Sequence, residues 1–136
     1  MLIRMLGTAS AILLLTVPLR AAECPVQHSG DVIAEALQKA ASCDSALKLF
    51  EACAYIASID SMFGAIVTDK CEADFLSRLS ASQRKTYDRE KDGCERKYKD
   101  KEGTMYRSFE AFCRAKLANA YAYKFAASPK PPAAQK

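Results

Sequence analysis

Apolar residues recur at helical spacing in the first half of the chain. Ser29 to Asp31 is a helix-start signal, and the apolar positions after it lie three and four residues apart, which predicts a first helix over residues 31–41. Asp44 or Ser45 can cap a second helix, which Gly64 interrupts or ends. The apolar positions of this second helix are Leu47, Leu49, Phe50, Cys53, Ala54, Ile56 and Ala57. So broad an apolar face predicts that the second helix is the most buried element.

Two further helices follow. A short third helix begins at Thr68-Asp69 and holds Cys71, Phe75 and Leu79. Ser80 and Gln83 form a capping box, Ser-x-x-Gln, which opens a long fourth helix that reaches about Lys101. The apolar stripe of this fourth helix is thin and consists of Tyr87, Cys94 and Tyr98.

Gly103 breaks the pattern, and Thr104 can cap a fifth helix that ends near Ala127. We expect its core face to be Met105, Phe109, Phe112, Cys113, Leu117, Ala120 and Tyr121. Most aromatic side chains of the chain should therefore lie in the core, Tyr55 and Phe63 among them. Tyr106 and Tyr123 are the two that we expect to be exposed.

These patterns predict an all-α fold, a small disulfide-stabilised bundle of four to five helices that ends in a helical hairpin. With five glycines the chain has too few turn formers for a β-sandwich or β-barrel, and its Ala-, Lys- and Glu-rich stretches favour helix. The chain has no glycine-rich phosphate loop, and 136 residues are too few for a TIM barrel. Rossmann, P-loop and TIM-barrel enzymes are therefore excluded.

The two ends of the chain differ in composition from the helical part between them. Residues 1–22 resemble a signal peptide, with a basic start at Arg4, an apolar run too short to span a bilayer and a cleavage site after Ala21 or Ala22. Residues 23–127 form the helical domain, and residues 128–136 are a proline-rich tail that we expect to be disordered. The mature protein is thus predicted to be secreted or periplasmic, with no stable membrane span.

All six cysteines follow the signal peptide, and an even number in an exported chain predicts three disulfides among Cys24, Cys43, Cys53, Cys71, Cys94 and Cys113. In the hairpin around residues 102–104, Cys94 and Cys113 are equidistant from the turn, so we expect them to pair. The sequence alone leaves the other four open. The same construction about a turn near residues 62–64 matches Cys53 with Cys71 and leaves Cys24 with Cys43.

The net charge is +4, and it falls to +2 if Arg4 and Arg20 leave with the signal peptide. So mild a balance, in an exported protein, argues against nucleic acid as a partner, because nucleic-acid binding needs a concentrated basic face. The basic residues gather in the fourth helix, where eight of them accompany five acidic ones: Arg84, Lys85, Arg89, Lys91, Arg96, Lys97, Lys99 and Lys101.

Interleaved signs on this helix are typical of a solvated face, and the pairs Asp92/Arg96 and Glu95/Lys99 have the spacing that stabilises a helix. The alternative is a surface that grips an anionic polymer of the cell envelope.

Catalytic and metal-binding patterns are missing from the sequence. The single histidine, His28, lies beside Ser29 before the first helix with no third group to orient a catalytic pair, so we expect a loop role. No two carboxylates stand out as a glycosidase pair. Cys43 and Cys53 are the closest cysteines, and their spacing fits neither a zinc site nor a thioredoxin motif. We therefore expect a non-enzymatic protein without cofactor or metal.

A set of spaced residues links the last two helices. Leu79-x-x-x-Gln83-Arg84 is followed by Cys94 eleven residues after the glutamine, by the turn Glu102 to Met105, and by Cys113 ten residues after Gly103. This arrangement resembles the small secreted domain of LprI-type lysozyme inhibitors. Upstream, Cys43 and Cys53, followed by Ala54 and Asp60, are similar to the cysteine-containing first helices of that family, so the resemblance covers residues 43–121.

The resemblance implies a protein that binds a lysozyme outside the cytoplasmic membrane and blocks its cleft sterically. A hairpin turn fixed by a disulfide is a good wedge because it loses little entropy on binding. The turn predicted to contact the partner consists of Glu102, Gly103, Thr104, Met105, Tyr106 and Arg107. Alternatively, Gly103 only closes the hairpin, and the protein is a structural or adaptor module of the envelope that binds an anionic polymer or a protein partner.

Overall fold

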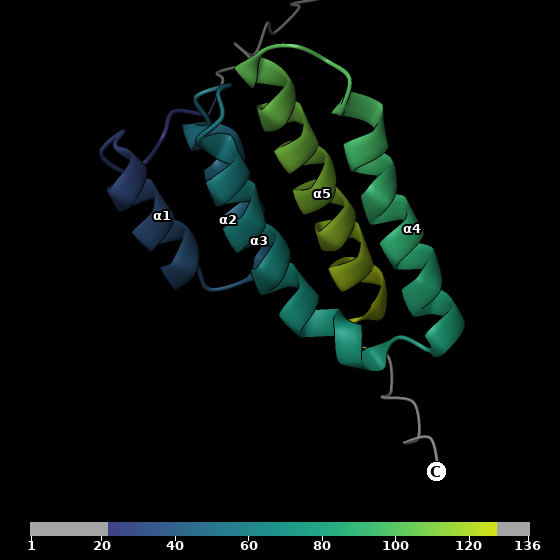
Figure 1. Cartoon of the computed structure of the whole chain (residues 1–136). Helices are drawn as coiled ribbons and strands as arrows, with labels where there is room; N and C mark the ends of the chain where they lie inside the picture. Colours follow the sequence, from purple (N-terminus) through teal and green to yellow (C-terminus); the bar gives the residue numbers. More distant parts are fainter. Residues whose placement is uncertain (1–21, 128–136) are drawn as a thin grey trace, which may run out of the picture.

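A computed structural model describes residues 22–127, and every regular element in this range is a helix (Figure 1). The helices are α1 (Gly30–Lys39), α2 (Cys43–Cys53), α3 (Asp60–Phe75), the 3₁₀ turn η1 (Leu76–Arg78), α4 (Ala81–Tyr98) and α5 (Thr104–Phe125). The predicted all-α class with a terminal hairpin is confirmed. Residues 1–21 of the predicted signal peptide and the predicted tail over 128–136 lie outside the described residues.

Helices α3 and α5 run side by side in the same direction through the middle of the bundle (Figure 1). Ser108 of α5 is hydrogen-bonded to Asp60 at the start of α3, and the rings of Tyr121 and Phe75 lie 5.6 Å apart at the other end. Helices α1 and α2 cover one side of α3, and α4 packs antiparallel against α5. Within residues 22–127, no helix combines the length and the hydropathy that crossing a bilayer requires.

Small residues allow α3 and α5 to pack closely. A Cβ atom on Gly64 would lie 2.7 Å from the Cβ of Ala111, closer than side-chain atoms approach one another, so the contact requires glycine. The buried residues of α5 continue this face at alternating spacings of three and four: Ser108, Ala111, Ala115, Ala118 and Ala122. The two central backbones therefore meet along a seam of small side chains.

This seam corrects the core face predicted for the fifth helix. Met105 and Ala120 are exposed, and the larger apolar residues flank the seam instead of filling it. Phe112 stacks on Phe50 of α2 with ring centroids 4.2 Å apart, and Tyr121 lies 4.8 Å from the ring of Tyr87. The periodicity identified an apolar helix but placed its centre on the bulky residues, because it gave small residues too little weight.

Two predicted helix boundaries are also wrong. The second helix ends at Cys53 rather than near Gly64, and α3 begins at Asp60 and passes through Gly64 and Thr68 without a break. Gly64 serves close packing here and does not end a helix. The second helix is capped by Ser42, whose side chain and that of Ser45 form a reciprocal capping box.

The predicted Ser80/Gln83 capping box opens α4 as expected. At the hairpin, Gly103 occupies the N-cap of α5 with φ of 106°, so Thr104 is the first helical residue and not the cap. A left-handed backbone at this position favours glycine.

The structure contains three disulfides, which indicate a protein that folds in an oxidising space outside the cytoplasm. Cys94 pairs with Cys113, as the hairpin predicts. The other two predicted pairs are wrong because the turn on which they depended does not exist: Cys24 pairs with Cys53, and Cys43 with Cys71.

We predict that Gly64→Ala destabilises the protein although alanine is the better helix former. The gain in helix propensity is about 1 kcal/mol, whereas forcing a methyl group into the seam costs about 1 to 3 kcal/mol. Gly93→Ala in α4 is the matched control, because its Cβ would meet only the Arg96 guanidinium at 3.6 Å. Urea unfolding should show Gly93→Ala as stable as the wild type or more so, and equal stability of the two variants would refute the seam.

Candidate functional site

The start of α3 and the start of α5 lie at the same end of the bundle (Figure 1). The loop of residues 54–59 and the first turns of both helices leave large apolar side chains in contact with solvent there. We call this set the apical surface; it consists of Tyr55, Ile56, Ile59, Met62 and Met105. A group of exposed apolar side chains at one end of a small domain is typical of a protein-binding site.

The loop behind this surface is held in place from inside. The Asp60 carboxylate is completely buried and accepts hydrogen bonds from the backbone N–H groups of Tyr55 at 3.0 Å and Ala57 at 3.3 Å. It also accepts one from the Ser108 hydroxyl at 2.6 Å. One carboxylate therefore fixes the loop and ties it to α5.

The segment before α1 supports the same loop. The Cys24–Cys53 disulfide joins this segment to the end of α2, and the His28 ring lies 2.9 Å from the Cys53 carbonyl through Nε2. The His28 and Tyr55 rings stack with centroids 4.1 Å apart, and the Tyr55 hydroxyl donates to the His28 carbonyl. His28 thus has the loop role that its position predicts, and Tyr55, expected in the core, lies at the surface.

Ile56 combines two unusual properties. Its φ is 55°, which puts a β-branched residue in the left-handed region, and its side chain is 46% exposed. A conformation of this kind costs about 1 to 3 kcal/mol and persists only where the surroundings enforce it. Here it directs an apolar side chain outward. The sequence did not single out Ile56 because the predicted second helix ran through this position. The signal that the helix had ended was a run of six consecutive apolar residues without helical spacing, 52–57.

The turn predicted from sequence to bind a partner adjoins the apical surface. Glu102, Gly103, Thr104, Met105 and Arg107 are exposed, and Tyr106 is half-buried beside Tyr98 and Phe109. Nothing lies within 4 Å of the position of a Cβ on Gly103, so the turn is open to solvent. Below it lies a shallow cavity of about 730 Å³, and the Cys94–Cys113 disulfide holds the two helices together farther down. The turn of residues 102–107 remains a prediction from the sequence, which did not single out residues 55–62.

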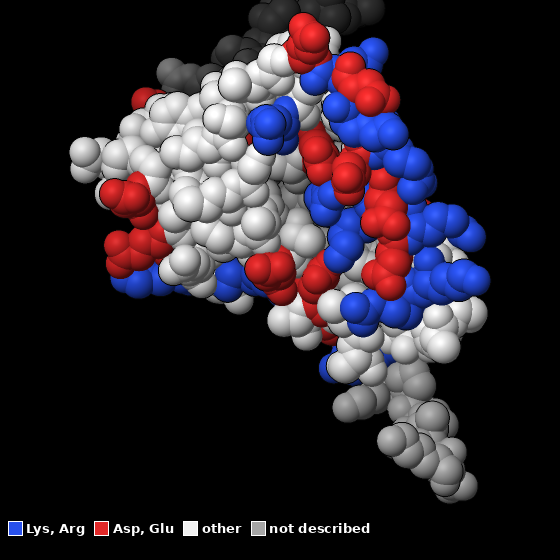
Figure 2. Space-filling model, viewed as in Figure 1, with Lys and Arg blue, Asp and Glu red and all other residues white. Residues whose placement is uncertain are grey.

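A groove continues from this turn, with α5 as its floor and α3 and α4 as its walls. Its central part has a volume of about 410 Å³ and is lined by Thr68 and Glu72 of α3, Lys91 of α4, and Arg107 and Arg114 of α5, among others. Acidic and basic side chains interleave along α4 and the strip beside it, whereas on the face shown in Figure 2 the centre of the surface over α1 to α3 is largely uncharged and charged groups lie at its edges.

Glu72 joins the two walls of the groove. Its carboxylate accepts hydrogen bonds from Lys91 and from the Tyr87 hydroxyl, both at 2.7 Å. Burial, together with this hydrogen bond to a carboxylate, raises the pKa of Tyr87 far above its usual range. Tyr87 therefore remains a hydrogen-bond donor at any physiological pH.

Two buried polar atoms in the groove lack partners. The Thr68 hydroxyl and the Nε–H of Arg114 make no hydrogen bond, although each is shielded from solvent. The Arg114 guanidinium uses its terminal nitrogen for Glu110 at 3.0 Å and Glu95 at 3.2 Å. An unpaired buried polar group costs about 1 to 3 kcal/mol, so two of them in one cavity call for an explanation.

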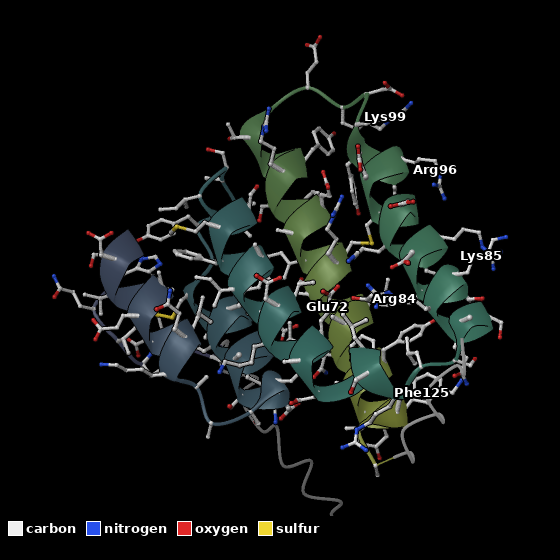
Figure 3. The ribbon with its side chains drawn as sticks, turned by 60° about the horizontal axis from the view of Figure 1, so that its bottom comes forward. Glu72, Arg84, Lys85, Arg96, Lys99 and Phe125 are labelled. Atoms are coloured by element: carbon white, nitrogen blue, oxygen red, sulfur yellow. A yellow bond between two sulfur atoms is a disulfide. The ribbon has the colours of Figure 1, made fainter. Side chains whose placement is uncertain are left out.

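The outer face of α4 is basic. Lys85, Arg89, Arg96 and Lys99 lie along the side opposite Tyr87 and Cys94, and we call them the basic ridge. Lys85, Arg96 and Lys99 project away from the bundle (Figure 3). The expected pairs Asp92/Arg96 and Glu95/Lys99 are replaced by other contacts. Glu95 forms an ion pair with Arg114, and Arg96 donates a hydrogen bond to the Arg89 carbonyl.

Among residues 22–127, no group of three or more histidine, cysteine, aspartate or glutamate side chains is arranged to hold a metal ion. Comparison of the chain with protein-family models, with curated proteins and with solved structures finds no match. The resemblance to lysozyme inhibitors therefore remains a prediction from sequence motifs.

We predict that Asp60→Asn lowers the free energy of unfolding by about 2 to 3 kcal/mol. The amide is a weaker acceptor than the carboxylate, and its NH₂ group would face N–H and O–H groups that are themselves donors. Asp69→Asn on the exposed side of the same helix is the control and should change it by less than about 0.5 kcal/mol. Urea unfolding measures both. Equal losses in the two variants would show that Asp60 does not hold the loop.

Proposed function

We propose that this is an exported, non-enzymatic binding protein, secreted or periplasmic, that docks on a protein partner through the apical surface. The observation that carries the proposal is Ile56, a strained and exposed apolar residue held in place by Asp60 and by the Cys24–Cys53 disulfide. Strain maintained at an exposed apolar position contributes nothing to folding, and binding gives it a role.

The physical basis of the affinity would be preorganisation. A loop that is already ordered loses little conformational entropy when a partner covers it, and buried apolar side chains at the centre of an interface supply most of its binding energy. Tyr55, Ile56 and Met105 would form that centre. Glu102 and Arg107, on the adjoining turn, would lie at the polar rim.

The partner that we propose is a lysozyme, which the resemblance of residues 43–121 to lysozyme inhibitors supports. The apical surface and the turn of residues 102–107 would enter the lysozyme cleft together and exclude its polymeric substrate. This contact is apolar at its centre, so its affinity does not depend on opposite net charges. The exported chain, at +2 without Arg4 and Arg20, has no net negative charge that would attract a basic lysozyme.

The test is suppression of bacterial cell-wall lysis by the purified exported protein. We expect inhibition at a ratio of about one to one, and a loss of about tenfold or more in affinity for Ile56→Asn. Asparagine tolerates the left-handed backbone, so this variant should be as stable as the wild type. Tyr123→Ala removes a 94% exposed aromatic residue near the end of α5 and serves as the control that keeps full inhibition.

No inhibition at a hundredfold excess of wild-type protein would exclude lysozyme as the partner. Full inhibition by Ile56→Asn would instead exclude the apical surface as the contact.

The basic ridge favours a second function, attachment to an anionic polymer of the cell envelope. Its four cations extend from Lys85 to Lys99, the C-cap of α4, over fourteen helical steps or about 21 Å, with only Asp92 among them on the same face. Such a row can follow a chain of regularly spaced anionic groups.

For this function we predict that retention on isolated cell envelopes decreases as salt is raised, because screening weakens exposed charge pairs. Lys85→Gln combined with Arg96→Gln should elute at lower salt than the wild type. Lys48→Gln on α2, where the lysine is paired with Asp44 at 2.8 Å, should elute with the wild type. Retention that is indifferent to salt and to the double substitution would exclude the ridge.

A further inference from the structure

The groove between α3 and α4 contains features that docking at the apical surface does not use. We propose that it binds a small zwitterion, an amino acid or short peptide with a free carboxylate and a free ammonium group. This proposal does not depend on the proposed partner, although the groove shares Arg107 with the rim of the apical contact.

The two residues whose buried polar atoms lack partners, Thr68 and Arg114, line the same cavity. Gly64 of α3 faces Ala111 of α5, and because the helices run parallel, one further turn along each brings Thr68 to the level of Arg114. Thr68 is only 7% exposed and lines the same cavity as Arg114. A hydroxyl and a guanidinium N–H that belong to one cavity and lack a protein acceptor are suited to a carboxylate of a ligand.

The charges of the cavity define the remainder of the ligand. Lys91 is paired with Glu72 and Arg114 with Glu110, which neutralises two cations and two anions. Arg107 and Asp69 also line the cavity, and within residues 22–127 neither forms an ion pair or a side-chain hydrogen bond. One cation and one anion therefore remain for a ligand that carries both signs.

The same charges disfavour a phosphate. Asp69, Glu72 and Glu110 would repel a dianion, whereas a carboxylate accompanied by its own ammonium group leaves the cavity neutral. The volume of about 410 Å³ lies at the lower end of the range of ligand sites, and Gly64, Ala65 and Ala111 leave room for a small side chain. A dipeptide of small residues fits these limits.

The experiment is a calorimetric titration of the purified exported protein with alanyl-alanine. Its C-terminal amide, its N-acetyl derivative and inorganic phosphate are the comparison ligands. We expect alanyl-alanine to bind with a dissociation constant of about 1 mM or lower, and each blocked form to bind at least about tenfold more weakly. Binding of the amide as tight as that of the dipeptide, preference for phosphate, or no binding of the dipeptide at about 20 mM would each overturn the proposal.

Substitutions locate the site. Arg107→Gln should weaken the binding of alanyl-alanine and leave the already weak binding of its amide unchanged. Asp69→Asn should weaken the binding of alanyl-alanine and leave the binding of the N-acetyl form unchanged. Thr68→Val removes the unpartnered hydroxyl at nearly constant volume, so it should abolish binding while the melting temperature stays the same or rises. Wild-type binding by all three variants would place the ligand elsewhere.

Lys85→Gln, outside the groove, is the matched charge control and should bind like the wild type. Ile56→Asn should also bind the dipeptide normally. A failure of the apical surface and a failure of the groove are therefore separate results.

Discussion

The close approach of α3 and α5 at Gly64 and Ala111 is the contact on which the other features of the molecule depend. Because the two backbones meet along small residues, the start of α5 comes within hydrogen-bonding distance of Asp60. This contact brings the two apical segments together. It also makes α5 the floor of a groove, since the backbone of α4 packs against that of α5 and α4 reaches α3 through side chains such as Tyr87 and Lys91. One glycine thus positions both the apical surface and the cavity beside it.

The sequence predicted those parts of the fold that depend on short-range signals. The Ser80/Gln83 capping box, the thin stripe of Tyr87 and Cys94, and the hairpin at Gly103 all involve residues a few positions apart, and each was located correctly. The hairpin construction also gave Cys94–Cys113. Applied to the second hairpin it failed only because the turn was misplaced, since Cys43 and Cys71 are each fourteen residues from Ala57, at the true turn.

What the sequence could not supply depends on contacts between distant residues. Gly64 has the same signature whether it ends a helix or admits a neighbouring one, and only the position of Ala111 decides between the two. The loop of residues 54–59 contains no glycine or proline, and a buried carboxylate whose role appears only in three dimensions holds it in place. Half of the candidate site, the turn near Met105, was therefore predicted from sequence. Ile56 and the partnerless Thr68 were not.

The connectivity of the first four cysteines has a consequence for maturation. The Cys24–Cys53 and Cys43–Cys71 bridges interleave, so neither joins cysteines that are consecutive in the chain. An oxidant that acted on thiols in the order of their synthesis would first link Cys24 to Cys43, a pair that the native fold does not contain. Reaching the native state then requires either oxidation delayed until α3 has docked or thiol–disulfide exchange that reshuffles the early bond. The yield of native protein therefore depends on whether the receiving compartment oxidises the chain slowly or can isomerise a bond formed too early.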